Sequence, residues 1–277
     1  MRVKLWGTRG SIAAAGPETT RYGGNTSCVA VHGDEGTVLV LDAGTGIRRL
    51  GASLLGAVKR VDVLLSHLHM DHIQGLGFFA PLYVPGMEVH LWGPASARAS
   101  LRDRLMRYLS PPLFPVHLRD LPCELFLHTV PDEFEIGEFR VRAETVCHPA
   151  PTVGYAVASH RHRVSYLPDH ELALGSVRFP HEPNWTSGYD IARGADLLIH
   201  DAQYTPDEYR DRVGWGHSTI EHAFAFADMC EVGHLVPFHH DPGHDDAALD
   251  LLFGEAITDL RPHFRVTPAT EGLEIEL

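Results

Sequence analysis

Short apolar runs rich in β-branched residues alternate along this chain with longer amphipathic stretches, and glycine or proline turns separate them. In the first half, the apolar runs predict strands at Val3–Trp6, Ser27–His32, Thr37–Leu41, Val61–Leu65 and Glu88–Trp92. The amphipathic stretches predict helices at Ile47–Leu55, Ile73–Leu82 and Ser96–Leu109. Three prolines at 111, 112 and 115 then end the regular alternation.

The second half repeats this alternation. It predicts strands at Phe134–Ile136, Phe139–Thr145, Thr152–Ser159, Arg163–Leu167, Leu197–His200 and His234–Phe238, and a helix at Thr219–Cys230. The stretch 171–195 lacks a clear period and is interpreted as irregular. Two β-rich halves with helices favour an α/β fold in which two sheets pack together and helices cover them. The length of 277 residues is compatible with a single domain over 1–277.

A cluster of histidines and one aspartate follows the fourth predicted strand. The segment Ser66–His72 has the spacing His67-x-His69-x-Asp71-His72. Because these residues leave a strand at one edge of a sheet, we expect their side chains to lie together. Neutral imidazole and carboxylate suit zinc, manganese or iron. The pairs His67 with His69, and Asp71 with His72, can each begin one of two adjacent metal sites.

Four later strand-like runs also end in histidine or aspartate. These residues are His148, Asp169, the pair His200-Asp201 and the pair His239-His240. Between the last two pairs lies Gly216-His217-Ser218-Thr219, whose hydroxyl groups can cap the helix that follows. The repeated placement at strand ends predicts one shared site.

The overall composition is typical of a globular protein, and its charge argues against nonspecific binding of nucleic acid. Hydrophobic residues make up 44% and charged residues 21%, and the formal net charge is -13. The acidic balance argues against capture of long nucleic acid and leaves room for a small anionic substrate. The four cysteines (Cys28, Cys123, Cys147 and Cys230) are scattered, which suits a reducing compartment. No apolar run has membrane-spanning length, so we expect a cytoplasmic protein with no membrane partner.

These motifs, in this order along the chain, make the sequence resemble the metallo-β-lactamase superfamily. The motif His67-x-His69-x-Asp71-His72 carries most of the resemblance. The segments Gly216-His217-Ser218-Thr219, His200-Asp201-Ala202 and Gly7-Thr8-Arg9-Gly10-Ser11 are similar to the phosphodiesterase branch, which includes ribonuclease Z and the phosphonate-pathway cyclic phosphodiesterases. The resemblance implies a four-layer αββα sandwich. It also implies a homodimer.

The resemblance further implies a ligand set for two divalent metal ions, with Zn²⁺ the first choice and Mn²⁺ or Fe²⁺ as alternatives. His67, His69 and His148 would hold one ion, and Asp71, His72 and His239 the other. Asp169 would bridge both ions. Asp42, at the end of a predicted strand, would orient a ligand imidazole by accepting its other N–H. His240 competes with its neighbour His239 for the last ligand position.

Two departures from the family pattern bear on the substrate. Asp169 lies in Pro168-Asp169-His170, where ribonuclease Z typically has Gly-Asp-Thr. Only the residues 149–168 separate His148 from Asp169, which leaves no room for the long tRNA-gripping arm of ribonuclease Z. The cysteine-rich zinc site of the phosphonate-pathway enzymes is also missing. We therefore expect a small or cyclic phosphodiester rather than a precursor tRNA.

Two divalent ions about 3.5–4 Å apart can share a water and lower its pKa toward neutrality, which provides a bridging hydroxide. Asp71 would orient this hydroxide, and His217 would protonate the leaving oxygen as general acid. Asp201 would hold His217 in the required tautomer. The alternative for His217 is a helix-capping or interior residue. The alternative activity is hydrolysis of a carboxylic ester, thioester or lactone, as in the glyoxalase II and lactonase branches, and a third reading is a noncatalytic or redox protein.

The remaining candidates are substrate contacts. Arg9 and Arg21 lie in the glycine-containing N-terminal loop and can bind phosphate in a bidentate manner. His170 and His240 lie beside predicted ligands, where they either contact substrate or have no such role. We expect substrate specificity to depend on the loops at 11–21 and 109–121.

Overall fold

The computed structural model describes residues 1–173 and 178–277, and the strands in these ranges form two seven-stranded sheets. The first sheet has, in spatial order, β14 (Glu274–Glu276), β1 (Arg2–Gly7), β2 (Cys28–His32), β3 (Val38–Leu41), β4 (Arg60–Leu64), β5 (Glu88–Gly93) and β6 (Glu124–Thr129). The second has β13 (Arg265–Val266), β12 (His234–Phe238), β11 (Leu197–Asp201), β10 (Arg163–Leu167), β9 (Val153–Ala158), β8 (Phe139–Thr145) and β7 (Glu133–Ile136).

The two sheets have the same internal plan. In the first sheet, the pairs from β14 to β3 are antiparallel and those from β3 to β6 are parallel. In the second, β7 to β10 are antiparallel and β10 to β13 are parallel. Parallel neighbours bring their carboxyl ends to the same edge of a sheet, so the residues that follow β3, β4, β10, β11 and β12 can meet there.

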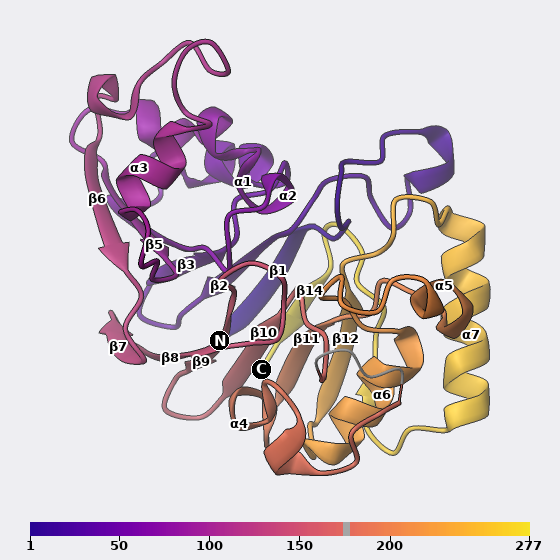
Figure 1. The fold of residues 1–277 in the computed structure, drawn as a ribbon. Coiled ribbons are helices and arrows are strands. Elements are labelled where there is room, and N and C mark those ends of the chain that lie inside the picture. Colours follow the sequence, from indigo (N-terminus) through magenta and orange to yellow (C-terminus); the bar gives the residue numbers. More distant parts are fainter. Residues whose placement is uncertain (174–177) are drawn as a thin grey trace.

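The hydrophobic core has three layers of side chains that define the four-layer αββα sandwich. The middle layer joins the facing surfaces of both sheets and includes Leu5, Phe139, Tyr155, Tyr166 and Phe238, all fully buried. Two outer layers lie between each sheet and its helices. On the first sheet the helices are α1 (Ile47–Leu54), α2 (Met70–Ile73) and α3 (Leu101–Met106); on the second they are α4 (Tyr189–Ala192), α6 (Ile220–Met229) and α7 (Asp246–Leu260) (Figure 1). The predicted fold class is therefore confirmed.

All of the predicted strands agree with the structure to within one residue at each end, and three agree at both ends: Phe139–Thr145, Arg163–Leu167 and His234–Phe238. The predicted helix at Ile73–Leu82 is wrong. Here α2 ends at Ile73 and short 3-10 turns follow at Leu76–Phe78 and Ala80–Tyr83. Gly75 explains the break, because a Cβ at this position would lie 2.1 Å from the Gly44 carbonyl oxygen, so the chain bends to pack against that turn.

The helix predicted at Ser96–Leu109 is shorter than expected, because Ser100 caps it by accepting from the Asp103 N–H at 3.1 Å. Several elements were not predicted: β6, β13, β14, α5 (Pro206–Arg210) and α7. The stretch 171–195, predicted as irregular, contains a 3-10 turn at Pro183–Trp185 and α4, while 174–177 lie outside the described residues. None of the described helices is long and apolar enough to cross a membrane.

The N-terminal loop between β1 and β2 is held by two arginines, Arg9 and Arg21. The Arg9 side chain is fully buried and donates to the carbonyl oxygens of Gly23 (2.8 Å), Asp241 (3.1 Å) and His244 (2.6 Å). Arg21 is exposed and donates to Asp250 at 2.7 Å, on α7. The Arg9 Nη2 atom is buried and has no partner among the described residues. Because the whole Arg9 side chain is buried, and its bonds to Asp241 and His244 join the loop to the C-terminal part of the chain, the expectation that it binds substrate is corrected. The exposed Arg21 also donates to the Asp246 carbonyl oxygen at 2.9 Å.

We predict that Arg9→Met destabilises the fold. The substitution leaves three buried carbonyl groups without their donor, and one unsatisfied buried acceptor costs about 1–3 kcal/mol. The free energy of unfolding, measured by urea denaturation, should fall by at least about 2 kcal/mol. Arg21→Met, the exposed control in the same loop, should change it little. Equal effects of the two substitutions would contradict this role for Arg9.

Candidate metal centre

The predicted ligands occupy the ends of four strands, at the edge where the two sheets meet. His67 and His69 lie in the loop after β4, and α2 then carries Asp71 and His72. Three further residues complete the set: His148 follows β8, Asp169 follows β10, and His239 follows β12 directly. Although neither is a glycine, Asp42 and His239 have positive φ values of 60° and 61°. Such backbone conformations recur at functional sites, where the surrounding structure maintains them.

The structure brings these residues together in two groups that share one carboxylate. His67, His69, His148 and Asp169 form the first group, and their candidate ligand atoms lie within 4.8 Å of one another. The second group meets the same limit and contains Asp71, His72, Asp169 and His239. Two adjoining donor sets of this kind match the arrangement expected for two metal ions.

The two oxygens of Asp169 face different groups. Its Oδ2 atom lies 3.5 Å from His67 Nε2 and 3.6 Å from His148 Nε2. Its Oδ1 atom lies 2.9 Å from His72 Nε2 and 3.1 Å from His239 Nε2. Asp169 itself is 2% exposed. A buried carboxylate with one oxygen toward each group has the geometry of a bridging ligand.

The donors fit divalent cations. Within the described part of the chain, the buried Nε2 atoms of His67 and His148 have no hydrogen-bond partner, although both point into the first group. Burial lowers the pKa of His67 well below its ordinary value and that of His148 to about 4, so both rings are neutral near pH 7. A neutral imidazole presents a lone pair, which is the form that binds zinc, manganese or iron. His69 is exposed, so the first group opens to solvent on its side.

Hydrogen bonds to the Nδ1 atoms, on the side of the rings away from the cluster, fix the orientation of the clustered imidazoles. Asp42 accepts from His72 Nδ1 at 2.7 Å and from the Tyr166 hydroxyl at 2.9 Å, and it also accepts from the backbone N–H of Ser66 at 2.7 Å. With Nδ1 donating, the Nε2 atom of His72 is left to face the second group. Asp42 thus makes the contact with a cluster imidazole that was predicted for it.

Sequence reasoning did not find the equivalent partners of the other rings. Gln203 Oε1 lies 3.0 Å from His239 Nδ1, and Thr152 Oγ1 lies 2.9 Å from His148 Nδ1. Gln203 lies two residues after the end of β11 at Asp201. This position just beyond a strand end is the one feature of the sequence that could have indicated its role. A lone glutamine or threonine has no ligand spacing, however, and only the tertiary structure shows its role.

His217 lies beside the second group with Asp201 behind it. Its Nδ1 atom is 2.7 Å from Asp201 Oδ2, and its ring is stacked on that of His239 at a centroid distance of 5.0 Å. Burial alone would lower the pKa of His217, but the Asp201 carboxylate, with Asp169 and Asp71 further away, raises it to about 9. The predicted contact between Asp201 and His217 is present, and it leaves Nε2 of His217 free to face a substrate.

A buried carboxylate that was not predicted shapes the loop before His217. Glu171, 2% exposed, accepts from the backbone N–H groups of Gly214 (2.8 Å) and Gly216 (3.3 Å). Gly216 has a φ of +91°, and a Cβ there would lie 2.2 Å from Cδ2 of His148. The glycine of Gly216-His217 is therefore required for the loop to pass the first group closely.

His170 and His240 do not reach the cluster. His240 is fully buried, and its Nε2 atom donates to the Ala269 carbonyl oxygen at 2.8 Å. His170 is also fully buried, with Nδ1 2.8 Å from Nε2 of His200. Their rings lie within the interior, which favours the alternative in which neither contacts substrate. The position within the second group is occupied by His239.

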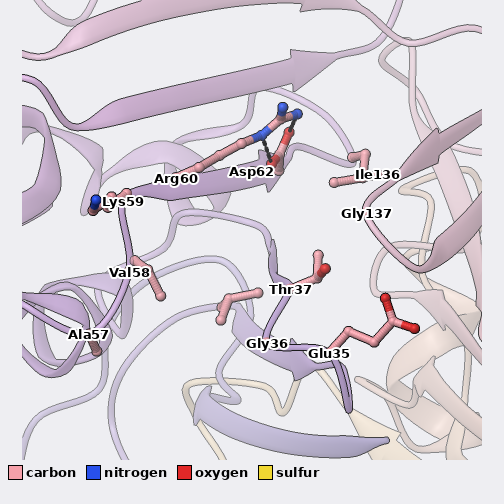
Figure 2. Close-up of a pocket in the computed structure, with 11 residues that line it drawn as sticks. Glu35, Gly36, Thr37, Ala57, Val58, Lys59, Arg60, Asp62, Ile136 and Gly137 are labelled. Atoms are coloured by element: carbon pink, nitrogen blue, oxygen red, sulfur yellow. Dashed lines mark hydrogen bonds and ion pairs between the residues drawn. The ribbon is translucent and has the colours of Figure 1, made fainter.

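A separate cavity of about 400 Å³ lies at the other end of the strands (Figure 2). It is lined by the hairpin at 35–38, the segment 57–60, Asp62 and the turn at 136–137. Arg60 pairs there with Asp62, with Nε 2.8 Å from Oδ2. Because none of the clustered histidines lines this cavity, it is not part of the candidate metal centre.

Comparisons with known proteins agree with this geometry. The family model described as "Beta-lactamase superfamily domain" matches residues 37–240. The chain is 26% identical to the ribonuclease Z of Natronomonas pharaonis, with 92% of this chain and 93% of that protein aligned. The metallo-β-lactamase fold protein YhfI from Bacillus subtilis superposes with a TM-score of 0.73 at 19% identity, covering 100% of this chain and 98% of that one.

A solved structure described as a new diphosphatase from the PhnP family is also similar. Its TM-score is 0.68 at 19% identity, and the match covers 100% of this chain and 97% of that one. At such identities the solved structures establish the fold, whereas the family match extends over most of the chain and includes all of the clustered residues. The chain therefore belongs to the β-lactamase superfamily.

Proposed function

We propose that this metal-dependent hydrolase is a phosphodiesterase that cleaves a small or cyclic phosphodiester, and that it uses two divalent cations, with zinc the first choice. The proposal rests mainly on the position and contacts of His217. It lies beside the second ligand group, and Asp201 holds its Nδ1 atom at 2.7 Å. A diester needs a proton on its departing oxygen, and this arrangement supplies a donor beside the place where the phosphoryl group would bind.

When bound, two divalent cations would polarise the phosphoryl oxygen and lower the pKa of an attacking water toward neutrality. Side chains of the protein would orient the water and transfer the protons. Asp71 is fixed by the backbone N–H of Ser11, which donates to Oδ2 at 2.8 Å, and the carboxylate can accept a proton from the water and orient it. His217 would then deliver a proton from Nε2 to the leaving oxygen while Asp201 stabilises the charged ring.

The substrate size follows from the segment between His148 and Asp169. Here β9 and β10 pair directly as an antiparallel hairpin, and only 159–162 join them. No arm that could grip a folded RNA is inserted at this position. The net charge of -13 also opposes binding along a nucleic-acid backbone. A PhnP-family diphosphatase among the solved structures of similar fold supports a small phosphate compound.

RNA 3′-end cleavage is the second candidate, because the relative from Natronomonas pharaonis that aligns over 92% of this chain is named ribonuclease Z. Hydrolysis of a carboxylic ester, thioester or lactone remains the alternative from another reaction class. A thioester expels a thiolate, which needs no proton donor, so that reaction leaves the His217–Asp201 pair without a clear purpose. An ester or a lactone expels an alkoxide, as a phosphodiester does, and the substrate panel below distinguishes these reactions.

The deciding experiment is a substrate panel with zinc- or manganese-loaded protein. Bis(p-nitrophenyl) phosphate, a p-nitrophenyl ester, an acyl thioester and a precursor tRNA are compared, with Asp71→Ala as control. We expect diester turnover that disappears in the control. Ester or thioester turnover without diester cleavage would overturn the phosphodiesterase assignment, and tRNA cleavage at a higher kcat/KM would favour the second candidate.

We predict that His69→Ala removes metal and activity together, because it deletes one donor of the first group while leaving the core unchanged. Metal content, measured by elemental analysis after dialysis, should fall by about one ion per chain, since a missing ligand weakens binding strongly. Diester turnover should fall with it, and a chelator should have the same effect on the unmodified protein. His160→Ala is the control, since His160 is exposed and outside both groups. Retention of full metal content by His69→Ala would contradict the ligand assignment.

His217→Ala and Asp201→Asn should separate catalysis from metal binding. Loss of a general acid typically costs about 10²–10⁴-fold in kcat, and Asp201→Asn should lower kcat by a smaller factor because the proton donor stays in place. Both variants should keep the metal content of the unmodified protein. A diester with a p-nitrophenolate leaving group, which needs little protonation, should be affected less than one with an alkoxide leaving group. Equal loss for both substrates would refute the acid role.

A further inference from the structure

Two adjoining cavities open beside the exposed side of the first ligand group. The nearer one has a volume of about 640 Å³ and is lined by His69, by the segment 95–99 and by residues 149–151. The farther one has a volume of about 580 Å³ and includes Met70, Ile73 and Leu113 in its wall. Leu68, Arg104 and Arg107 line both cavities, so the two form one groove that begins at a candidate metal ligand.

Three arginines give this groove an unbalanced positive charge. Arg98, Arg104 and Arg107 line the near cavity, and no Asp or Glu lines either cavity. Among the described residues, none of the three forms an ion pair, whereas Arg2, Arg21 and Arg60 all pair with carboxylates. In a chain with 36 acidic and 23 basic residues, a groove without a carboxylate is a distinct feature.

Arg104 is the best placed of the three. Its NH2 group donates to the Pro94 carbonyl oxygen at 2.5 Å, which fixes the direction of the side chain. Its Nε atom is buried and has no partner in the described part of the chain. A guanidinium held in one orientation loses little entropy when it binds an anion.

The farther part of the groove is apolar and open. Met70 is 49% exposed and Leu113 is 70% exposed. The partly buried Leu68 and Tyr108 and the buried Ile73 complete the apolar part of that wall. Large side chains exposed together at a cavity indicate a site where apolar surface is buried on binding.

We propose that this groove binds the part of the substrate that lies beyond the scissile phosphate, and that this part is an apolar or aromatic body with an anionic group of its own. The anionic group would contact Arg104 and Arg107, and the apolar body would lie against Leu68, Met70 and Leu113. This proposal rests on the proposed function, since it places the scissile diester at the metal centre next to His69. The substrate is then a diester with one amphiphilic, negatively charged arm.

The first test is a binding measurement on metal-free protein, which does not depend on catalysis. The probe is 8-anilinonaphthalene-1-sulfonate, a fluorescent aromatic anion, and N-phenyl-1-naphthylamine is its counterpart without the charge. We expect one saturable site for the anion. The double variant Arg104→Gln/Arg107→Gln should weaken its binding by about tenfold or more, because hydrogen bonds to charged groups are lost. The uncharged dye should bind equally to both proteins.

Two single variants complete the binding test. Leu113→Ser should weaken both dyes by about three- to tenfold through the loss of apolar contact. Arg102→Gln is the matched control, since Arg102 is an exposed residue of the same helix and lines neither cavity. Melting temperatures confirm that the variants are folded. Anion binding that is unchanged in the double variant, or weakened equally by Arg102→Gln, would overturn the proposal.

The second test uses metal-loaded protein and two aryl diesters, p-nitrophenyl phenyl phosphate and the same compound with a carboxylate on the phenyl ring. We expect a higher kcat/KM for the carboxylated diester, and we expect the double variant to abolish the difference by raising KM. No cleavage of either diester would refute the proposed function. The dye experiment would still show whether the groove binds an aromatic anion. Dye displacement by RNA oligonucleotides that strengthens with length, but not by an aryl phosphate, would overturn the small-ligand assignment.

Discussion

The site depends on the burial of one shared carboxylate. Asp169 is 2% exposed, and four imidazole nitrogens lie within 3.6 Å of its two oxygens. Burying an ionised group without compensation costs far more than a folded protein can lose, so the groups around it must supply opposite charge. The neutral rings of His67 and His148, whose Nε2 atoms lack other partners among the described residues, do not supply it. Burial would lower the pKa of His72, but Asp169, Asp71 and Asp42 raise it well above its ordinary value, so this ring supplies part of the opposite charge. Divalent cations bound at the two groups would add to that charge and would also engage the lone pairs of His67 and His148.

The sandwich provides the positions that this arrangement requires. Each sheet contributes parallel strands whose carboxyl ends lie at the common edge, and the cluster draws on β4, β10 and β12 from different sheets. The rings are then oriented from behind, by Asp42 for His72 and by Gln203 for His239. The fully buried core between the sheets keeps these strand ends in register, so that a shift of one strand would separate the donors that now lie within 4.8 Å.

The sequence predicted which side chains gather at the strand ends better than it predicted the helices. A motif such as His67-x-His69-x-Asp71-His72 has a spacing that directly reflects its chemistry, and all seven proposed ligands lie in the two groups. The helix expected at Ile73–Leu82 fails because Gly75 packs against the Gly44 turn, a contact between segments that no local period reveals. Arg9, Arg21, His170 and His240 were interpreted from their proximity to the motifs along the chain. Their actual contacts depend on Gly23, Asp250, His200 and Ala269, which the tertiary fold brings near them.

The arginines of this chain differ in whether their contacts stabilise the fold or leave the guanidinium able to bind a ligand. Arg9 belongs to a segment that resembles the family, yet its side chain is fully buried and donates from Nε and Nη1 to three carbonyl groups of the protein. Arg104 and Arg107 belong to no motif, yet they face a groove that starts at His69 and contains no carboxylate. A guanidinium can bind an external anion only with donors that the fold has not already engaged. Arg9 is fully buried, whereas Arg104 is partly exposed and Arg107 is exposed. The exposure of a guanidinium and its engaged donors, rather than its closeness to a motif, therefore decide whether it can contact a bound anion.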